Sequence, residues 1–263
     1  MRLTHIGGPT VLIETEGWRI LTDPTFDPPG RRYGFGWGTS STKTAGPALQ
    51  PHEVGPIDVV LLSHDHHADN LDALGREALT AAGTVVTTRP GARRLGHPHV
   101  RGLEPGEATT ITRPGRPDLT LIATPCRHGP PLSRPVAGTV IGFALGVGSS
   151  TTTRLWMTGD TVLHDAVRRT ATGLDVDVLL VHLGCVRFPI TGPLRYSMSS
   201  RDALELIALS NPRVAVPVHY EGWSHFSQPE DVARRTLTGV TTTQVHWLDR
   251  GVAAEVPPRE QAR

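Results

Sequence analysis

The chain of 263 residues has two cysteines, a single lysine and no long hydrophobic run. Cys126 and Cys185 are too few for a disulfide framework and lack Cys-x-x-Cys spacing, so each is expected to be a free buried thiol or to line a site. No apolar stretch approaches the roughly 20 residues that cross a bilayer, and the N-terminus lacks the layout of a signal peptide. We therefore expect a cytoplasmic protein without a membrane span.

The chain also lacks an excess of either charge, with 26 lysines and arginines against 25 aspartates and glutamates. A nucleic-acid partner is not expected, because no basic excess is available to bind a phosphate backbone. There is no Gly-x-Ser-x-Gly nucleophile elbow and no phosphate-binding glycine-rich loop. Two familiar routes to hydrolysis or phosphate transfer are thereby excluded.

Glycine and proline are abundant, at 28 and 23 residues, which favours many turns and short strands. Strands are expected at residues 3–6, 10–14, 18–21, 57–62, 84–87, 99–101, 119–124, 139–145, 154–157, 176–181 and 213–217, and around Val245 and Val252. Helices are expected at residues 71–82, from Pro90, and at 162–171, 199–209 and 229–237. Strands followed by alternating strands and helices predict two β-layers covered by helices.

We find no linker that would split the chain, so one domain over residues 1–263 is expected. Residues 24–51 read as a long loop that carries four aromatic residues and docks on the domain, and residues 257–263 read as a flexible polar tail.

The strongest chemical signal is the segment 63–72, Ser-His-Asp-His-His-Ala-Asp-Asn-Leu-Asp, directly after the apolar run 57–62. Imidazoles and carboxylates are ligands that Zn²⁺ and similar cations select, so this loop predicts a metal site. Its candidate ligands are His64, His66, His67 and Asp69, with Asp65 and Asn70 as weaker candidates. Asp69 is also expected to cap the following helix.

Five candidate site residues each follow a predicted strand: His64, His128, Asp160, His182 and His219. This position would gather them at one edge of the sheets.

These motifs resemble those of the metallo-β-lactamase superfamily, and most closely its ascorbate-6-phosphate lactonase-like and N-acyl-phosphatidylethanolamine phospholipase-like branch. The resemblance extends over nearly the whole chain and rests on segments 3–7, 20–24, the histidine loop, 124–129, 159–161, 196–198 and 217–220. It implies the α/β fold class, as a four-layer αββα sandwich with one or two metal ions at the edge of the sheets.

The histidine loop departs from the family's His-x-His-x-Asp-His pattern by one extra residue. Counted from the strand, His64 and His66 match the two histidines; counted back from the helix, Asp69 matches the aspartate and His67 the second histidine. Either His66 or His67 therefore completes the first site, and the spacing to Asp69 favours His67. Asn70 stands where the family has its last histidine, which predicts a weakened second metal position.

The resemblance assigns His64, His128 and one of His66 and His67 to the first metal, and Asp69, Asp160 and His219 to the second, with Asp160 bridging. Asp69 and Asp160 are the expected catalytic carboxylates, and His182 and His225 are further catalytic candidates that would contact the reacting groups. His5 and Asp23 are expected to support the ligands through hydrogen bonds.

The expected activity is that of a zinc-dependent hydrolase, with one or two ions and with manganese or iron as alternatives. Zinc held by imidazoles lowers the pKa of bound water to about 7, which provides hydroxide for attack on a small ester, lactone or phosphodiester. An anionic substrate group would be contacted by arginines such as Arg31, Arg32, Arg127, Arg187 and Arg195. A non-catalytic metal-binding or sensing protein is the main alternative, and a nuclease is a weaker one.

Overall fold

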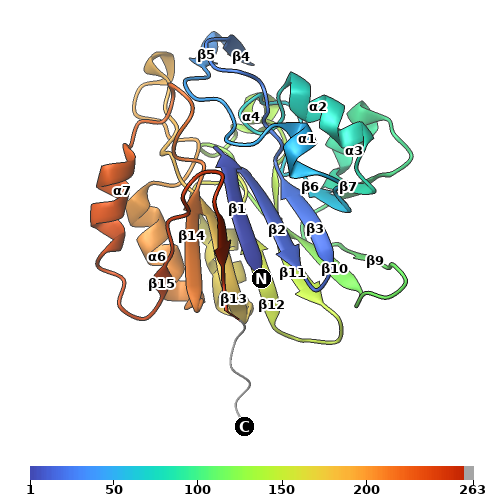
Figure 1. The fold of residues 1–263 in the computed structure, drawn as a ribbon. Coiled ribbons are helices and arrows are strands. Elements are labelled where there is room, and N and C mark those ends of the chain that lie inside the picture. The colour runs from blue at the N-terminus through green and yellow to red at the C-terminus, as the bar shows by residue number, and fades with distance from the viewer. Residues whose placement is uncertain (258–263) are drawn as a thin grey trace.

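The computed structural model describes residues 1–257, which form two seven-stranded sheets packed face to face (Figure 1). Of the expected flexible tail, all but Pro257 lies outside these residues. The first sheet has the order β16 (Ala253–Glu255), β1 (Arg2–Gly7), β2 (Thr10–Thr15), β3 (Trp18–Thr22), β6 (Val59–Leu61), β7 (Thr84–Thr88) and β8 (Val100–Leu103). Its pairs are antiparallel from β16 to β3 and parallel from β3 to β8.

The second sheet has the order β9 (Ala108–Ile111), β10 (Leu119–Pro125), β11 (Ile141–Val147), β12 (Thr153–Met157), β13 (Val176–His182), β14 (Val214–Val218) and β15 (Gln244–Val245). It repeats the succession of the first sheet, with three antiparallel pairs followed by three parallel pairs. Strands β10, β12, β13 and β14 consequently run in the same direction, and their C-terminal ends share one edge.

Alternating side chains explain how two sheets and two helical layers form. In β6, Val59 and Leu61 face the other sheet, whereas Val60 faces the helices. In β13, Leu180 faces the other sheet and Leu179 the helices on its own side. Successive side chains of a strand point to opposite faces, so continuous apolar strands are apolar on both faces and need cover on each.

The helices supply that cover (Figure 1). Helices α1 (Pro51–Val54) and α2 (Ala73–Thr80) pack on the first sheet together with α3 (Arg89–Leu95). Helices α5 (Asp165–Gly173), α6 (Ser200–Ser210) and α7 (Glu230–Leu237) pack on the second sheet. Two short segments, α4 (Arg134–Ala137) and a 3₁₀ turn at Pro189–Thr191, lie in loops. The predicted αββα sandwich is confirmed.

Two predicted helix starts are wrong. Asp72, not Asp69, caps α2, because the chain first turns at His67, whose carbonyl accepts the Asn70 and Leu71 amides. Helix α5 starts at Asp165 rather than at residue 162, with His164 as its cap. The Ser199–Asp202 capping box of α6 is confirmed.

The segment 24–51 is not a structureless loop, because it contains a β-hairpin of β4 (Arg32–Gly36) and β5 (Thr39–Thr42). The hairpin stands at the end of the molecule opposite the chain's N-terminus (Figure 1). Strand β9 was also not predicted from the sequence. Within residues 1–257, no helix combines the length and the hydrophobicity needed to cross a membrane.

Candidate metal centre and its cavity

Three imidazoles from two sheets converge on one point. His64 and His67 follow β6, and His128 follows β10. His67 Nδ1 lies 3.2 Å from His64 Nε2 and 3.2 Å from His128 Nε2. Two nitrogens bound to a tetrahedral zinc ion at 2.0–2.1 Å stand about 3.3 Å apart. The separation of these nitrogens therefore fits a shared metal ion.

The opposite ring nitrogens are held by hydrogen bonds that orient the rings. His128 Nδ1 donates to the Tyr196 carbonyl at 2.6 Å, and His64 Nδ1 lies 2.9 Å from the Ser63 hydroxyl. A hydrogen bond at one nitrogen leaves the other as a lone-pair donor. Burial lowers the pKa of His64 and His67 well below the usual value, and lowers that of His128 to about 4, so these rings are neutral at pH 7.

The neighbouring candidates of the loop are directed elsewhere. His66 Nε2 lies 2.6 Å from the Ala137 carbonyl, to which it donates. His66 occupies space that Gly138 leaves open, since a Cβ on Gly138 would lie 2.2 Å from its ring. Asp65 forms a two-pronged ion pair with Arg94, with Nε and Oδ2 2.8 Å apart. His66 still has a ring nitrogen near those of His64 and His67.

A second cluster combines carboxylates with His219. Asp160 follows β12 and its Oδ1 lies 3.3 Å from His219 Nδ1, while Asp69 Oδ2 lies 3.5 Å from His219 Nε2. His219 follows β14 and has a left-handed backbone, with φ of 56°. Such a conformation costs free energy in a non-glycine residue and is typical of functional sites. Asp69, Asp160 and His219 all bring ligand atoms within 4.8 Å of one another.

This second cluster has buried polar atoms that protein groups leave unpaired. Both Asp160 oxygens and Asp69 Oδ1 have no hydrogen-bond partner. Burial, together with the charges of Asp69 and Asp23, raises the pKa of Asp160 well above its usual value. Burial alone would raise the pKa of Asp69 too, but the adjacent imidazoles of His219 and His225 outweigh it and hold that pKa well below normal. Buried carboxylates in this state are stabilised by a cation, so the residues fit a divalent metal.

Asn70, Asp23 and His182 form a polar layer behind this cluster. Asn70 Nδ2 donates to Asp23 Oδ2 at 3.2 Å and has its Oδ1 unpaired. Asp23 Oδ1 accepts the Ser63 amide at 2.6 Å, and Asp23 Oδ2 lies 3.5 Å from His182 Nε2. The position of Asp23 agrees with its expected supporting role, whereas His5 contacts the Gly8 carbonyl. His182 is fully buried and does not line the cavity described below.

His225 lies beside Asp69, with His225 Nε2 3.2 Å from Asp69 Oδ2. Its ring packs against Phe35 and Phe188, with ring centroids 5.4 and 5.6 Å away. The two cysteines take no part in either cluster: Cys185 is buried, and Cys126 donates to the Thr158 carbonyl at 3.0 Å.

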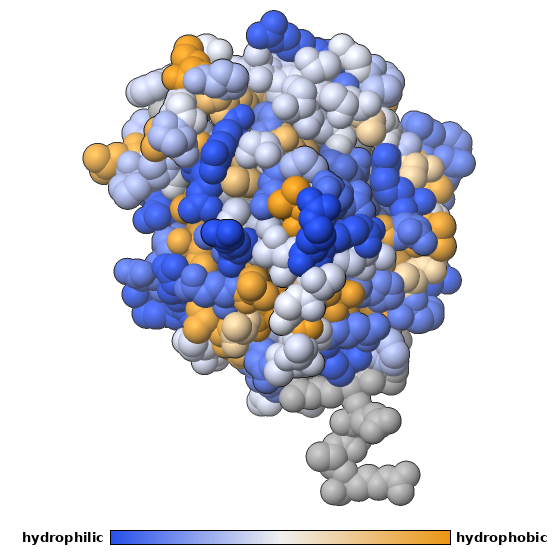
Figure 2. All heavy atoms as spheres, turned by 90° about the vertical axis from the view of Figure 1, so that its left-hand side faces the viewer, coloured by the Kyte–Doolittle hydropathy of each residue, from blue (hydrophilic) through white to orange (hydrophobic). Residues whose placement is uncertain are grey.

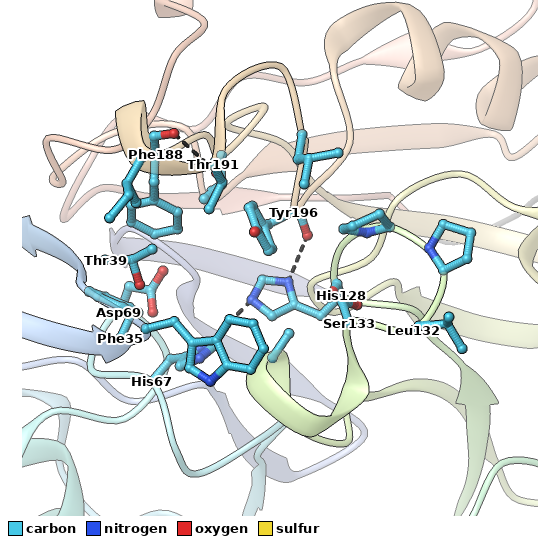
Figure 3. A pocket seen from close by; sticks show the side chains of 17 residues that line it. Phe35, Thr39, His67, Asp69, His128, Leu132, Ser133, Phe188, Thr191 and Tyr196 are labelled. Carbon is cyan, nitrogen blue, oxygen red and sulfur yellow. Dashed lines mark hydrogen bonds between the residues drawn. The ribbon is translucent and has the colours of Figure 1, made fainter.

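A cavity of about 460 Å³ opens onto the metal-ligand candidates. Figure 3 shows His67, Asp69 and His128 on its floor, with the rings of Phe35, Phe188 and Tyr196 around them. Its volume is in the range of small-molecule sites, about 300–1,000 Å³. Phe188 and its loop were not predicted from the sequence. The signal that could have indicated them is the number of apolar residues between Cys185 and Tyr196 in a segment without a predicted helix or strand.

The arginines suggested as anion ligands do not line this cavity. Arg127 lines a neighbouring one, and Arg32 and Arg187 line a third. Arg195 pairs with Asp202 at 2.6 Å, and the exposed Arg31 lies over the Tyr33 ring. His97 is exposed and His99 half-buried, both far along the chain from the clusters.

The family model of the beta-lactamase superfamily domain matches residues 18–220. A UPF0173 metal-dependent hydrolase of Carboxydothermus hydrogenoformans is 31% identical over 232 residues, covering 85% of this chain and 86% of that protein. The chain belongs to the UPF0173 family of the metallo-β-lactamase superfamily. A further UPF0173 metal-dependent hydrolase, from Desulforamulus reducens, is 25% identical over 266 residues, covering 95% and 98% of the two chains.

Solved structures agree on the fold of this family member. An isothiocyanate hydrolase from Delia radicum gut bacteria superposes with a TM-score of 0.79 at 19% identity, over 97% of this chain and 99% of that one. A possible metal-dependent hydrolase from Veillonella parvula gives a TM-score of 0.81 at 18% identity, with the same coverage. At these identities the likeness shows the fold alone. The metallo-β-lactamase superfamily that the motifs predicted is confirmed. The matches do not assign the chain to the lactonase-like and phospholipase-like branch.

Proposed function

We propose that this UPF0173 member is a metal-dependent hydrolase whose first cation is held by His64, His67 and His128. The observation that carries the proposal is the position of His67 Nδ1, which lies 3.2 Å from both His64 Nε2 and His128 Nε2, beside a cavity that His67 and His128 line. Neutral imidazoles of this number and spacing favour zinc, with manganese or iron as the alternatives.

A second cation would be held by Asp69, Asp160 and His219. Asp160 has two unpaired oxygens and lies within reach of both clusters, since it also groups with His64 and His128. A carboxylate with two available oxygens is suited to bridging two cations. Asn70 donates to Asp23 through its amide nitrogen, so it supports this site by orienting the carboxylates rather than by replacing the family's histidine.

Cations in such a site polarise an acyl oxygen and lower the pKa of a water molecule. The chain's own residues supply positioning and proton transfer. Asp69 lines the cavity with Oδ1 unpaired, where it accepts a hydrogen bond from the attacking water and orients it. His225 fixes Asp69 through Oδ2, and His182 supports Asp23 from behind. The aromatic walls exclude bulk water, which strengthens the electrostatic interactions inside.

Metal analysis combined with hydrolysis assays tests this proposal. Purified protein is expected to bind one to two zinc equivalents and to hydrolyse at least one member of a panel of esters, lactones and phosphodiesters. His128→Ala should lose metal and reduce turnover by at least about 10²-fold. His97→Ala, an exposed histidine that belongs to neither cluster, is the matched control and should change neither. Equal metal content in the two variants would reject the ligand assignment.

A further inference from the structure

We infer that the substrate is an uncharged ester or lactone whose acyl part carries an apolar group, and not a phosphodiester or another anion. This inference rests on the proposed function, because it concerns what the cavity above the metal-ligand candidates admits. It is carried by the composition of the cavity wall, by the side chains at its rim and by the positions of the cationic residues.

The wall of the cavity is mostly apolar, with Thr39, Ser133 and Thr191 as its polar members. Phe35, Phe188 and Tyr196 form a continuous aromatic side, with ring centroids 5.9 Å apart for Phe35 and Phe188 and 5.6 Å apart for Phe188 and Tyr196. Pro130, Pro131 and Ala137 contribute further apolar lining. An apolar substrate group gains free energy from leaving water here, whereas a charged one would lose its hydration without a partner.

The rim gathers most of the exposed large apolar side chains that the structure describes. Trp37, Leu132, Ile190 and Leu194 line the cavity and are 78%, 94%, 67% and 42% exposed. Among the other residues whose exposure the structure describes, only Ile122 and Val252 share this character. On the face of the molecule shown in Figure 2, hydrophobic residues lie in small groups among hydrophilic ones. An apolar cluster around one opening marks a binding site for an apolar ligand.

The backbone holds two of these rim residues in an unfavourable conformation. Trp37 has φ of 50° and Leu132 has φ of 70°, a left-handed region that bulky side chains rarely adopt. The rim segments also touch one another, since a Cβ built on Gly38 would lie 3.2 Å from Ile190 Cδ1. Strain of this kind persists where function requires it, which agrees with a role for these side chains in contacting substrate.

No arginine or lysine lines the cavity, among the residues for which the structure gives a position. Asp69 is the only acidic lining residue, and the proposed cations would neutralise it, so an anionic substrate is disfavoured by the walls of the cavity and not by its floor. Phosphate and carboxylate groups are recognised by arginine pairs or lysine, and Arg127 and Arg134 line only the adjoining cavity, which shares His128, Pro130, Leu132 and Ser133 with this one. The cavity therefore disfavours the phosphodiester among the substrates that the family resemblance suggested.

A chain-length series tests the inference. Neutral p-nitrophenyl acetate, butyrate and hexanoate are compared with bis(p-nitrophenyl) phosphate on the zinc-loaded protein. We expect kcat/KM to rise about twofold to fourfold for each added methylene, and the phosphate diester to be the poorest substrate. Trp37→Ala and Ile190→Ala should lower kcat/KM for the hexanoate about tenfold and for the acetate less than twofold. Ile122→Ala and Val252→Ala, the exposed apolar residues outside the cavity, are the controls and should alter neither.

A binding measurement separates failure of this inference from failure of the proposed function. Hexananilide, a neutral amide, and phenyl phosphate are titrated by calorimetry into the zinc-loaded and chelator-treated protein. Hexananilide should bind with a negative heat-capacity change, and this change should be smaller in Trp37→Ala. If it binds in this way but no substrate is turned over, the proposed hydrolase is rejected while the apolar preference of the cavity is kept. Preferred turnover of the phosphate diester would keep the hydrolase and reject the inference. The inference would also be rejected if the rim variants altered the oligomeric state but neither binding nor turnover.

Discussion

The direction of single side chains favours His67 over His66 as the proposed metal ligand of the histidine loop. His67 turns its Nδ1 toward His64 and His128, whereas His66 donates to the Ala137 carbonyl. The spacing of the loop in the sequence left these two histidines as alternatives. The choice depends on the turn that starts at the His67 carbonyl, a backbone feature that residue types alone do not specify.

Paired alanine variants test that choice. His67→Ala is expected to lose the first metal equivalent, because two of the three imidazoles cannot hold zinc tightly. His66→Ala should keep it and lose less than about 1.5 kcal/mol of stability through its hydrogen bond to Ala137. Zinc content by atomic emission after gel filtration measures both. The reverse pattern would assign the ligand to His66.

Asp160 is predicted to lower the free energy of unfolding of the metal-free protein. Its carboxyl is buried with both oxygens unpaired, beside Asp69 and Asp23, and its pKa is raised. Asp160→Asn removes this group's charge at constant size, so we expect the metal-free protein to gain about 1–3 kcal/mol. The same variant should bind less zinc. Urea denaturation in chelator, with Asp249→Asn as the surface control, measures the stability, and a loss of stability would contradict the role given to Asp160.

At the level of elements, Asp72 joins a helix, a loop and the β4–β5 hairpin. It caps α2 by accepting the Gly75 amide, and it accepts the Phe26 and Asp27 amides at 2.9 and 2.7 Å. The single lysine of the chain, Lys43, follows the hairpin and places Nζ 2.8 Å from Asp72 Oδ2, with only 3% of its side chain exposed. The hairpin that carries Trp37 is thereby fixed to the segment that carries the metal-ligand candidates.

Breaking this buried pair should be costly. Lys43→Met leaves Asp72 as an unpaired buried charge, and we expect the free energy of unfolding to fall by about 3–5 kcal/mol. Adding Asp72→Asn should recover part of the loss, because no charge then remains buried. Arg235→Met removes an exposed ion pair with Asp231 and should cost less than about 0.5 kcal/mol. Similar losses for Lys43→Met and Arg235→Met would refute the assignment.

Most strands and helices were predictable because each carries a local signal. The apolar runs of β6 and β13 and the Ser199–Asp202 capping box of α6 are examples. The β4–β5 hairpin was not predicted, because its strands are short and rich in glycine, serine and threonine and are held by distant partners. Ser224 illustrates this: its hydroxyl accepts the Thr42 amide at 2.9 Å from 182 residues away. Long-range contacts of this kind leave no periodic pattern.

For the whole molecule, the proposed metal centre joins the two sheets. His64, His67 and Asp69 follow a strand of the first sheet, and the remaining ligand candidates follow strands of the second. A ligand that binds only the folded protein stabilises it by about 4 kcal/mol at a thousandfold excess over its dissociation constant. We therefore expect chelation to lower the melting temperature by about 10 °C, as measured by calorimetry with and without added zinc. An unchanged melting temperature would place the metal elsewhere.

The pairing of β16 with β1 has a consequence for synthesis on the ribosome. Residues Ala253–Glu255 cover the outer edge of the first strand, yet they are synthesised about 250 residues after it. At bacterial-type elongation rates of about 5–20 residues per second, the nascent chain carries β1 for roughly 12–50 s before its partner exists. An uncovered strand edge is a template for pairing with other chains. The edge of β1 that β16 covers is therefore open to pairing with other chains until residues 253–255 have been synthesised.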